Sequence, residues 1–369
     1  MIVEVTPDGG DVAQIEALAR AAGAVDGVAP LGEQPLRALR AHAGGGAVGG
    51  GADGRATDDG AADGSAADGG AADGGGAGAA AADVRHLLAR AGDAPDADVV
   101  GYAQISGTGA DATAELVVHP DHRRRGIGAD LVRAVLGREP AVAVWAHGAL
   151  PGAVALAEGL GMTRTRELLR MRRRAADGPA LPERRPVEGV EFGTLAEAVS
   201  EGGDRWPGLD ARAEFLRVNN AAFHWHPEQG GWTPAQLDER LAVDWVDTGA
   251  IFLAVDTATA DTTAADTAAA GTAADTAAAP RLAGFHWTKT VAEPGEPVEG
   301  EVYVVAVDPA DQGRGLGGVL TSIGVEHLEG PVGAESVVLY VEGDNRPAIR
   351  TYEKLGFAIE LVDVTYTSS

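Results

Sequence analysis

The chain has 369 residues and a formal net charge of −26, which disfavours nucleic acid and anionic membranes as partners because like charges repel. It contains no cysteine, which excludes disulfide staples, cysteine-ligated zinc and a cysteine nucleophile. The first residues do not resemble a signal peptide, and no run of about 18 apolar residues suggests a membrane span. We therefore expect a cytoplasmic protein with neither nucleic acid nor membrane as partner. We also predict a monomer, although the sequence does not determine the oligomeric state.

Two segments consist almost entirely of small and acidic residues. Gly44 to Asp83 is nearly all Gly, Ala and Asp, and Asp256 to Ala279 is nearly all Thr, Ala and Asp. Neither segment has large apolar side chains to offset the entropy of ordering, so both are predicted to be disordered insertions on the surface of the fold.

The hydrophobic pattern of the first half predicts alternating strands and helices. In chain order, it predicts strands at Val99–Ser106 and Ala112–Val118, a helix at Ile127–Leu136, a strand at Ala141–Ala146, a helix at Ala153–Leu160 and a strand at Leu168–Arg172. A stretch rich in proline and charge follows, RAADGPALPERRPV. We predict an N-terminal domain over residues 1–174, a linker over 175–186 and a C-terminal domain over 187–369.

The second half follows a similar order. It is predicted to begin with helices at Ala211–Phe223 and Pro234–Ala242, and to continue with strands at Ala250–Val255 and Leu282–Thr288, which form a hairpin around the second insertion. The later elements are a strand at Glu301–Val307, a helix at Leu316–Glu329, a strand at Ser336–Val341, a helix at Pro347–Leu355 and a strand at Ile359–Thr367.

The two halves are an internal repeat. The stretch HPDHRRRGIG, which starts at His119, aligns without a gap with DPADQGRGLG, which starts at Asp308. The segment from Val144 to Met162 also aligns with the segment from Leu339 to Phe357. Tandem duplication is the simplest account of this similarity.

The repeated glycine loop predicts an anion site in each half. Each loop lies between a strand and a helix, so glycines permit a tight turn while main-chain N–H groups point outward at the helix start. The nearby arginines add positive charge for charge-assisted hydrogen bonds. The spacing matches neither the P-loop nor the dinucleotide-binding fingerprint.

The pattern Q/R-x-x-G-x-G/A between a strand and a helix, followed by DNRPAIRTYEKLGF, resembles the GCN5-related N-acetyltransferases (GNAT), in which the loop carries the pyrophosphate of acetyl-CoA. The tandem arrangement, with DGVAPLGEQPL, AAFHWHPEQGGWT, GFHWTK and LTSIGVEHL, resembles the mycothiol synthases, an actinobacterial family with two such domains. The resemblance covers nearly the whole chain outside the insertions. It implies an α/β (α+β) fold of two tandem GNAT domains, each a mixed, mostly antiparallel sheet flanked by helices.

The resemblance also implies a reaction. Acetyl-CoA is the acetyl donor, with one site per domain and catalysis in the C-terminal one, and the acceptor is the cysteinyl amine of a cysteinyl-glucosaminyl-inositol. By resemblance, Glu301 is the general base, acting through water, and Tyr352 is the general acid that protonates the CoA thiolate. Taken without the family, the residues favour a simpler interpretation, in which Glu301 is a solvated carboxylate at a strand end and Tyr352 is a core aromatic residue.

The remaining site residues come from the same resemblance. In the second half, the implied coenzyme contacts are Val305, Ala306, Val307, Gln312, Gly313, Arg314, Gly315, Leu316, Gly317, Gly318, Asn345, Arg346, Pro347, Ala348, Ile349 and Arg350. In the first half, they are Leu116, Val117, Val118, Arg124, Arg125, Gly126, Ile127, Gly128 and Ala129. The implied acceptor contacts are Glu33, Glu228, Lys289, Glu301 and Tyr340. Because Glu33 belongs to the first half, the acceptor would lie in a cleft between the halves.

The ungapped repeat predicts a division of labour. Glu301, Asn345 and Tyr352 fall opposite Ala112, Leu150 and Ala157, so the first half keeps the loop without the chemical groups. Two other functions remain open: a tandem acetyltransferase acting on another amine, such as an antibiotic or a protein N-terminus, and a non-catalytic acyl-CoA-binding module. No metal site is expected, because His224 and His226 do not face one ligand point and no third ligand accompanies them.

Overall fold

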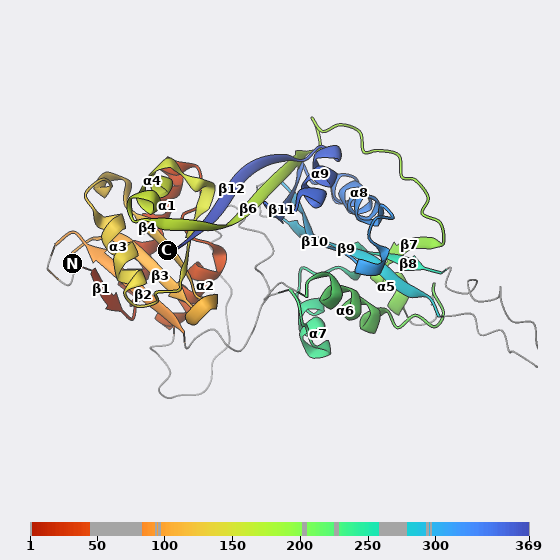
Figure 1. Ribbon diagram of the computed structural model, residues 1–369, viewed down its shortest axis with the longest axis horizontal. Coiled ribbons are helices and arrows are strands. Elements are labelled where there is room, and N and C mark those ends of the chain that lie inside the picture. The colour runs from red at the N-terminus through yellow and green to blue at the C-terminus, as the bar shows by residue number, and fades with distance from the viewer. Residues whose placement is uncertain are drawn as a thin grey trace, which may run out of the picture.

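The computed structural model describes residues 2–44, 83–92, 94, 97–200, 205–224, 229–257, 279–292, 295 and 297–368. Both predicted insertions lie almost entirely outside these residues. The described elements form two lobes that share one twelve-stranded sheet, in the order β1-β2-β3-β4-β5-β12-β6-β11-β10-β9-β8-β7 (Figure 1). Of the helices described, none combines the length and the hydropathy needed to cross a membrane.

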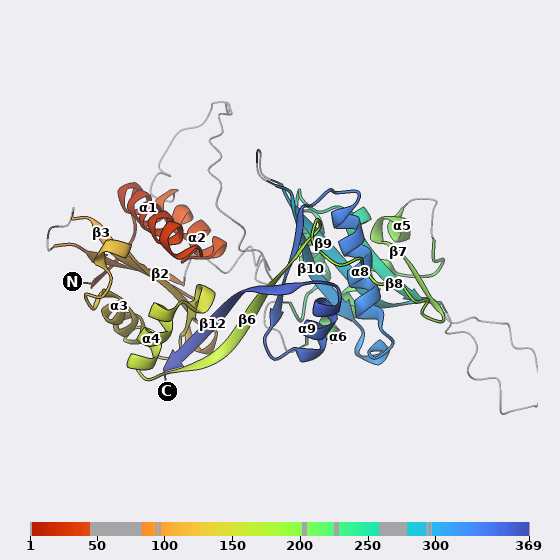
Figure 2. The same cartoon turned by 90° about the horizontal axis from the view of Figure 1, so that it is seen from above.

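The N-terminal lobe packs helices on both faces of its part of the sheet. Helices α1 and α2 lie on one face and α3 and α4 on the other (Figure 2). Helix α1 begins at a capping box in which Asp8 and Asp11 each accept from the other's main-chain N–H, and it ends at Gly27 in the left-handed conformation. The elements are β1 (Ile2–Val5), α1 (Gly9–Asp26), α2 (Glu33–Gly44), β2 (Val84–Arg90), β3 (Val99–Ser106), β4 (Thr113–Val118), α3 (Ile127–Leu136), β5 (Ala143–Ala146), α4 (Pro151–Gly159) and β6 (Met162–Arg174).

The C-terminal lobe repeats this layering. Helices α6 and α7 lie on one face of its strands, and α8 and α9 lie on the other (Figure 1). The elements are β7 (Val190–Thr194), α5 (Leu195–Val199), α6 (Ala211–Ala222), α7 (Pro234–Leu241), β8 (Ile251–Asp256), β9 (Arg281–Val291), β10 (Glu299–Val307), α8 (Leu316–Glu329), β11 (Ser336–Glu342), α9 (Arg346–Lys354) and β12 (Ala358–Ser368).

Large aromatic side chains hold α6 to the sheet. The rings of Phe215 and Phe285 stack with centroids 3.8 Å apart, and Trp287 contacts Phe215 edge-on. All three side chains are buried. Each such side chain contributes about 1.5–3 kcal/mol by leaving water. This packing joins α6 to β9.

The last strand of each lobe is exchanged with the other lobe. Strand β6, from the first half of the chain, pairs with β11 through Leu168 to Arg174, whereas β12 pairs with β5 through Val364 to Tyr366. The two exchanged strands also pair with each other, and they form the ribbon that bridges the lobes (Figures 1 and 2). The C-terminus therefore lies against the N-terminal lobe (Figure 1).

Most predicted elements are confirmed. The helices predicted at 127–136 and 316–329 match α3 and α8 at both ends, and β8 and β9 form the predicted antiparallel hairpin. No prediction was made for β1, α1, α2, β2, β7 or α5. Strand β6 begins at Met162 rather than at Leu168, because its first residues pair with β12 from the other end of the chain.

Candidate active site

Strands β10 and β11 separate at the point where the expected general base lies. They run parallel and pair only where Glu299 to Glu301 meet Ser336 to Val338. Beyond that point β10 continues to Val307 and β11 to Glu342, with no further pairing between these two fully described strands. Asp308 donates its N–H to Ala283 of β9, so the alternate residues Val305 and Val307 direct their N–H and C=O groups to the unpaired edge, where they are available to an extended ligand.

The glycine loop joins the end of β10 to α8. Gly313 and Gly315 have φ angles of 84° and 83°, a conformation that L side chains rarely adopt. Gly315 caps α8 without any side-chain hydrogen bond. The first N–H groups of α8, at Leu316, Gly317 and Gly318, thus point out of the helix end, where the helix dipole favours an anion.

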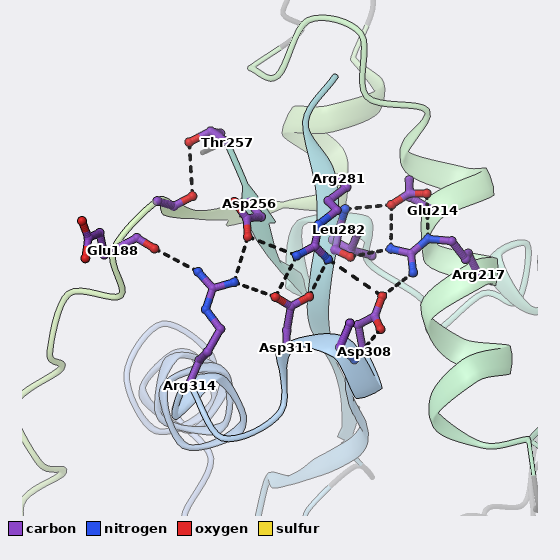
Figure 3. A network of polar contacts seen from close by, with 12 residues as sticks. Glu188, Glu214, Arg217, Asp256, Thr257, Arg281, Leu282, Asp308, Asp311 and Arg314 are labelled. Carbon is purple, nitrogen blue, oxygen red and sulfur yellow. Dashed lines mark hydrogen bonds and ion pairs between the residues drawn. The ribbon is translucent and has the colours of Figure 1, made fainter. Parts of the chain in front are cut away.

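The Arg314 side chain turns away from the helix end and braces the loop (Figure 3). Its guanidinium donates to the Asp256 carboxylate at 2.8 Å and to Asp311 at 2.6 Å, and also to the main-chain oxygen of Glu188 at 2.9 Å. Hydrogen bonding to Asp256 and Asp311 raises the pKa of Arg314. The positive charge of Arg314 is therefore paired with carboxylates and does not point at the predicted anion site. The donors that face this site are main-chain N–H groups.

The same network extends to both sides of the second insertion. Arg281 donates to Asp311 at 2.8 Å and to Asp256 at 3.2 Å (Figure 3). Burial acts to raise the pKa of Asp311, but hydrogen bonds from Arg281 and Arg314 outweigh it and lower that pKa. Asp256 was predicted to be the first residue of the disordered insertion, but it is buried at the end of β8, and Arg281 begins β9. The glycine loop is therefore held by the residues that end β8 and begin β9.

Glu301 and Lys289 are neighbours across β10 and β9. They are directly paired in the antiparallel register and so share one face of the sheet. Glu301 is only 2% exposed, which makes the interpretation of it as a solvated strand-end carboxylate wrong. The Lys289 ammonium lies 5.3 Å from the Trp245 ring and 5.7 Å from the Tyr303 ring, within cation–π range. A β-bulge at Tyr303 interrupts the register next to Glu301, as bulges beside active sites often do.

Tyr352 and Asn345 both lie on α9, which follows β11. Tyr352 packs edge-on against Phe357 with ring centroids 6.1 Å apart, and burial raises its pKa to about 12. Asn345 caps the helix, and its side chain accepts a hydrogen bond from the N–H of Ala348 at 3.2 Å. Asn345 therefore has a structural role whether or not it touches a coenzyme, and residues 346–350 form the first turns of the helix that it caps.

Tyr340 on β11 lies opposite Arg170, a residue that the first half of the chain supplies through β6. Arg170 also donates to Glu299 at 2.9 Å and forms an ion pair with Glu360. Burial acts to lower the pKa of Arg170, but Tyr340 and the two carboxylates more than offset it, so that pKa is raised. No sequence pattern pointed to Arg170, because its neighbours are set by the strand exchange.

The structure says less about Glu33 and Glu228, the two remaining predicted acceptor contacts. Glu33 begins α2, and its carboxylate forms an ion pair with Arg37. Helix α2 lies on the side of the N-terminal lobe that faces the C-terminal lobe (Figures 1 and 2). Glu228 and His226 fall outside the described residues. Among the residues described, no group of three His, Cys, Asp or Glu side chains could hold a metal ion.

The N-terminal loop reproduces the shape of its counterpart. Gly126 has a φ angle of 87°, and Arg124 takes the left-handed value of 62° at the position that aligns with Gly313. Arg123 donates two hydrogen bonds of 2.7 Å to Asp26 of α1. The predicted contacts at 116–118 end β4, and those at 124–129 form the loop and the start of α3.

Strands β4 and β5 of the N-terminal lobe also separate, but different side chains lie beside the point of separation. Strands β4 and β5 pair only at Thr113 and Ala114. Beyond them, His147 lies 3.5 Å from Glu115 and 3.5 Å from Asp363 of β12. No sequence pattern groups these three residues, because β12 comes from the far end of the chain.

Comparison with known proteins agrees with this geometry. Residues 245–357 match the model of the acetyltransferase (GNAT) family, and residues 83–160 match a second acetyltransferase (GNAT) domain model. Two solved structures share the fold over 99% of this chain. One is a GCN5-related N-acetyltransferase from Sphaerobacter thermophilus (TM-score 0.57, 20% identity, 94% of that chain), and the other a tandem GNAT protein from the clavulanic acid biosynthesis pathway (TM-score 0.54, 18% identity, 98% of that chain).

Relatives of known name are much closer in sequence. The mycothiol acetyltransferase of Mycolicibacterium gilvum is 41% identical over 362 residues, which cover 96% of this chain and 94% of that protein. The enzyme of the same name from Mycolicibacterium smegmatis is 40% identical over 366 residues, covering 98% and 96%. The expected fold of two GNAT domains is confirmed, and the protein is an acetyltransferase. The chain belongs to the mycothiol acetyltransferase family of tandem GNAT enzymes.

Proposed function

We propose that the protein transfers the acetyl group of acetyl-CoA to the cysteinyl amine of a cysteinyl-glucosaminyl-inositol, giving mycothiol and CoA. The observation that carries this proposal is the buried Glu301 beside Lys289, at the point where β10 leaves β11 and leads into the glycine loop. The name shared by relatives of about 40% identity along nearly the full chain supports this choice of acceptor.

Residues of the C-terminal lobe divide the chemistry between them. Glu301 accepts a proton from the acceptor ammonium through a water molecule, which frees the amine to attack the thioester carbonyl. Main-chain N–H groups of β10 polarise that carbonyl as negative charge develops on its oxygen. Tyr352 then donates its phenolic proton to the sulfur as the carbon–sulfur bond breaks. The carbon–nitrogen bond of the amide forms and the carbon–sulfur bond breaks, and the attacking nitrogen releases its second proton, which restores the phenol of Tyr352.

Only the second half of the chain carries these groups. Ala112, Leu150 and Ala157 stand at the aligned positions of the first half and offer neither an acid nor a base. We assign turnover to the C-terminal lobe and a non-catalytic acetyl-CoA site to the N-terminal glycine loop. The N-terminal lobe also contributes Arg170 through β6, and helix α2 with Glu33 borders the acceptor cleft.

Acetyl transfer to a panel of amines tests the proposal. The panel contains the cysteinyl-glucosaminyl-inositol, glucosaminyl-inositol without cysteine, free cysteine, an aminoglycoside and a peptide N-terminus. CoA and the acetylated product are measured by chromatography with mass detection, because the thiol of the acceptor would react with thiol reagents. We expect product chiefly from the cysteinyl sugar. Turnover of other amines alone would remove the acceptor assignment, and no turnover with any amine would favour an acyl-CoA-binding module.

Substitution of the proposed base provides the second test. Glu301→Gln keeps the shape of the side chain but cannot accept the proton, and we expect kcat to fall by about 10²- to 10⁴-fold. Glu353→Gln is the matched control, since Glu353 is an exposed carboxylate on α9. An equal loss in both variants, or a change in KM alone for Glu301→Gln, would contradict the assigned role.

A further inference from the structure

A cavity of about 920 Å³ lies beside the glycine loop. Three segments line it: the loop with the first turns of α8, the C-terminal part of α9, and residues 182–188 of the linker between the lobes. The Glu301 side chain is on the other face of the sheet, because its neighbour Gly300 faces Leu328 of α8 and successive residues of a strand alternate in direction. The cavity is therefore separate from the proposed reaction centre.

The linker is held against this cavity at two points. The Arg314 guanidinium donates to the main-chain oxygen of Glu188 at 2.9 Å, and Arg184 forms an ion pair of 2.6 Å with Glu326 of α8. Pro182 and Pro186 restrict the backbone of the same segment. Arg185 lies between the two attachment points, lines the cavity and is exposed.

Two of the cations that line the cavity are not paired with any carboxylate in the described part of the chain. These two are Arg185 and Lys354 of α9, whereas Arg184 is paired with Glu326. The chain as a whole carries a net charge of −26, so most of its surface repels an anion. Glu183 and Glu188 also line the cavity, so its charge is mixed, and an anionic group is favoured only on the side of Arg185, Lys354 and the N-terminus of α8.

The order of the groups along acetyl-CoA indicates which of them would reach this cavity. The molecule has the thioester at one end, a pyrophosphate in the middle and a 3′-phosphorylated adenosine at the other end. If the thioester lies near Glu301 and the pyrophosphate lies on the N–H groups of Gly315 to Gly318, the adenosine must continue past the loop. The cavity walled by the linker and α9 is the space on that side.

We propose that the linker between the lobes is a wall of the catalytic coenzyme site, and that Arg185 together with Lys354 binds the 3′-phosphate of acetyl-CoA. The proposal rests on the proposed use of acetyl-CoA by the C-terminal lobe. Arg185 supplies a planar fork of donors suited to a phosphate, and Lys354 supplies a point charge. The segment that connects the two lobes thereby becomes part of the binding site of one of them.

Comparison of two coenzymes isolates the 3′-phosphate. We would measure the Kd of acetyl-CoA and of acetyl-3′-dephospho-CoA by calorimetry, using the full chain and its Arg185→Ala, Lys354→Ala and doubly substituted variants. If the N-terminal loop also binds coenzyme, the isotherm is fitted to two sites, and the site that is weakened by Gly126→Val, at a loop position with a φ of 87°, is assigned to the N-terminal lobe. Arg212→Ala is the matched control, since Arg212 is an exposed arginine on α6 that pairs with Asp238.

We expect wild type and Arg212→Ala to bind acetyl-CoA about tenfold more tightly than the dephospho form. Arg185→Ala should lose most of this preference, and the double variant all of it, with the Kd of the dephospho form unchanged. A preference that persists in the double variant, or that is absent from wild type, overturns the assignment of the 3′-phosphate while leaving acetyl-CoA binding intact. Failure of wild type to bind either coenzyme would instead refute the proposed function itself.

Discussion

Arg314, in the glycine loop, donates a hydrogen bond of 2.8 Å to Asp256, which lies 58 residues earlier at the end of β8. The contact joins the loop before α8 to the strand that leads into the second insertion. A basic residue in an anion-binding loop suggests a direct bond to the anion, yet here the guanidinium holds the loop and the main chain faces outward. The positions of the loop N–H groups therefore depend on a carboxylate outside the motif.

Asp256→Asn tests this dependence. The substitution removes the negative charge of a carboxylate that both Arg314 and Arg281 contact. Both guanidinium groups then depend on Asp311 as the carboxylate that they share. We expect the KM for acetyl-CoA to rise several-fold with kcat nearly unchanged, and the free energy of unfolding to fall by about 1–3 kcal/mol. Steady-state kinetics and urea unfolding measure the two effects.

The matched control for this prediction is Asp238→Asn. Asp238 pairs with Arg212 on the surface, where an ion pair contributes about 0–1 kcal/mol. The control should leave both the KM and the stability close to wild type. An Asp256→Asn variant with an unaltered KM for acetyl-CoA would show that the loop keeps its shape without this bond.

Tyr352→Phe tests the general acid. Burial raises the pKa of Tyr352 to about 12, so the phenol keeps its proton at neutral and moderately alkaline pH. We expect kcat to fall by about 10²- to 10⁴-fold, and kcat of the wild-type enzyme to show no alkaline decline from this group below pH of about 11. Tyr366→Phe removes a phenol from β12 in the N-terminal lobe and should retain full activity.

The division of labour between the lobes is tested by a variant in the first loop. Arg124 is exposed and adopts a φ of 62°, a value that alanine would inherit with the same strain. Arg124→Ala should therefore fold normally and keep nearly the wild-type kcat, because the first half lacks the acid and the base. Equal impairment of Arg124→Ala and Tyr352→Phe would contradict the assignment of turnover to the C-terminal lobe.

Arg170→Gln tests the contribution of the exchanged strand. The variant removes the cation next to Tyr340 and leaves Glu299 and Glu360 with Arg172 as their remaining cation. We expect the KM for the acceptor to rise several-fold while the KM for acetyl-CoA stays the same. Arg170→Lys, which keeps the charge, should restore part of the loss, and Arg164→Gln on the exposed start of β6 should have no effect. Parallel changes in both KM values would indicate a general structural defect.

The buried side chain of His286 is expected to make the free energy of unfolding depend on pH. Its side chain is fully buried between β9 and α8, and burial lowers its pKa from 6.5 to about 4. Between these values the unfolded chain binds a proton that the folded chain refuses, so stability falls as the pH drops from 6.5 towards 4. From about pH 7.5 to about pH 5 this single group should cost about 2 kcal/mol.

His286→Gln should remove that contribution. The glutamine amide can still donate to the main-chain oxygen of Leu320, which the imidazole contacts at 2.8 Å, but it does not titrate. The difference between wild type and variant in urea unfolding, measured at the two pH values, isolates the effect from other acid-sensitive groups. His224→Gln, at an exposed histidine, should show no such difference, and a pH slope that is unchanged in His286→Gln would refute the prediction.

The sequence alone was sufficient for the elements that local chemistry specifies. Helix α8 was predicted from Leu316 to Glu329 because glycine precedes it, apolar residues repeat along it and glycine follows it. The repeated loop, and the absence of the proposed catalytic side chains at Ala112 and Ala157, can be seen by aligning the chain with itself. Helix α1 was missed even though its capping box, Asp8 with Asp11, was present in the sequence as a start signal.

Only the tertiary structure decided which distant segments meet. Strand β6 could pair beside β5 or beside β11 with the same alternation of side chains, and the choice depends on packing between lobes rather than on any local signal. That choice places Arg170 beside Tyr340, and the fold likewise brings Asp256 to Arg314 and the linker to the cavity. Backbone preferences act over a few residues, whereas a strand edge or a buried carboxylate acquires its partner only when the whole chain has folded.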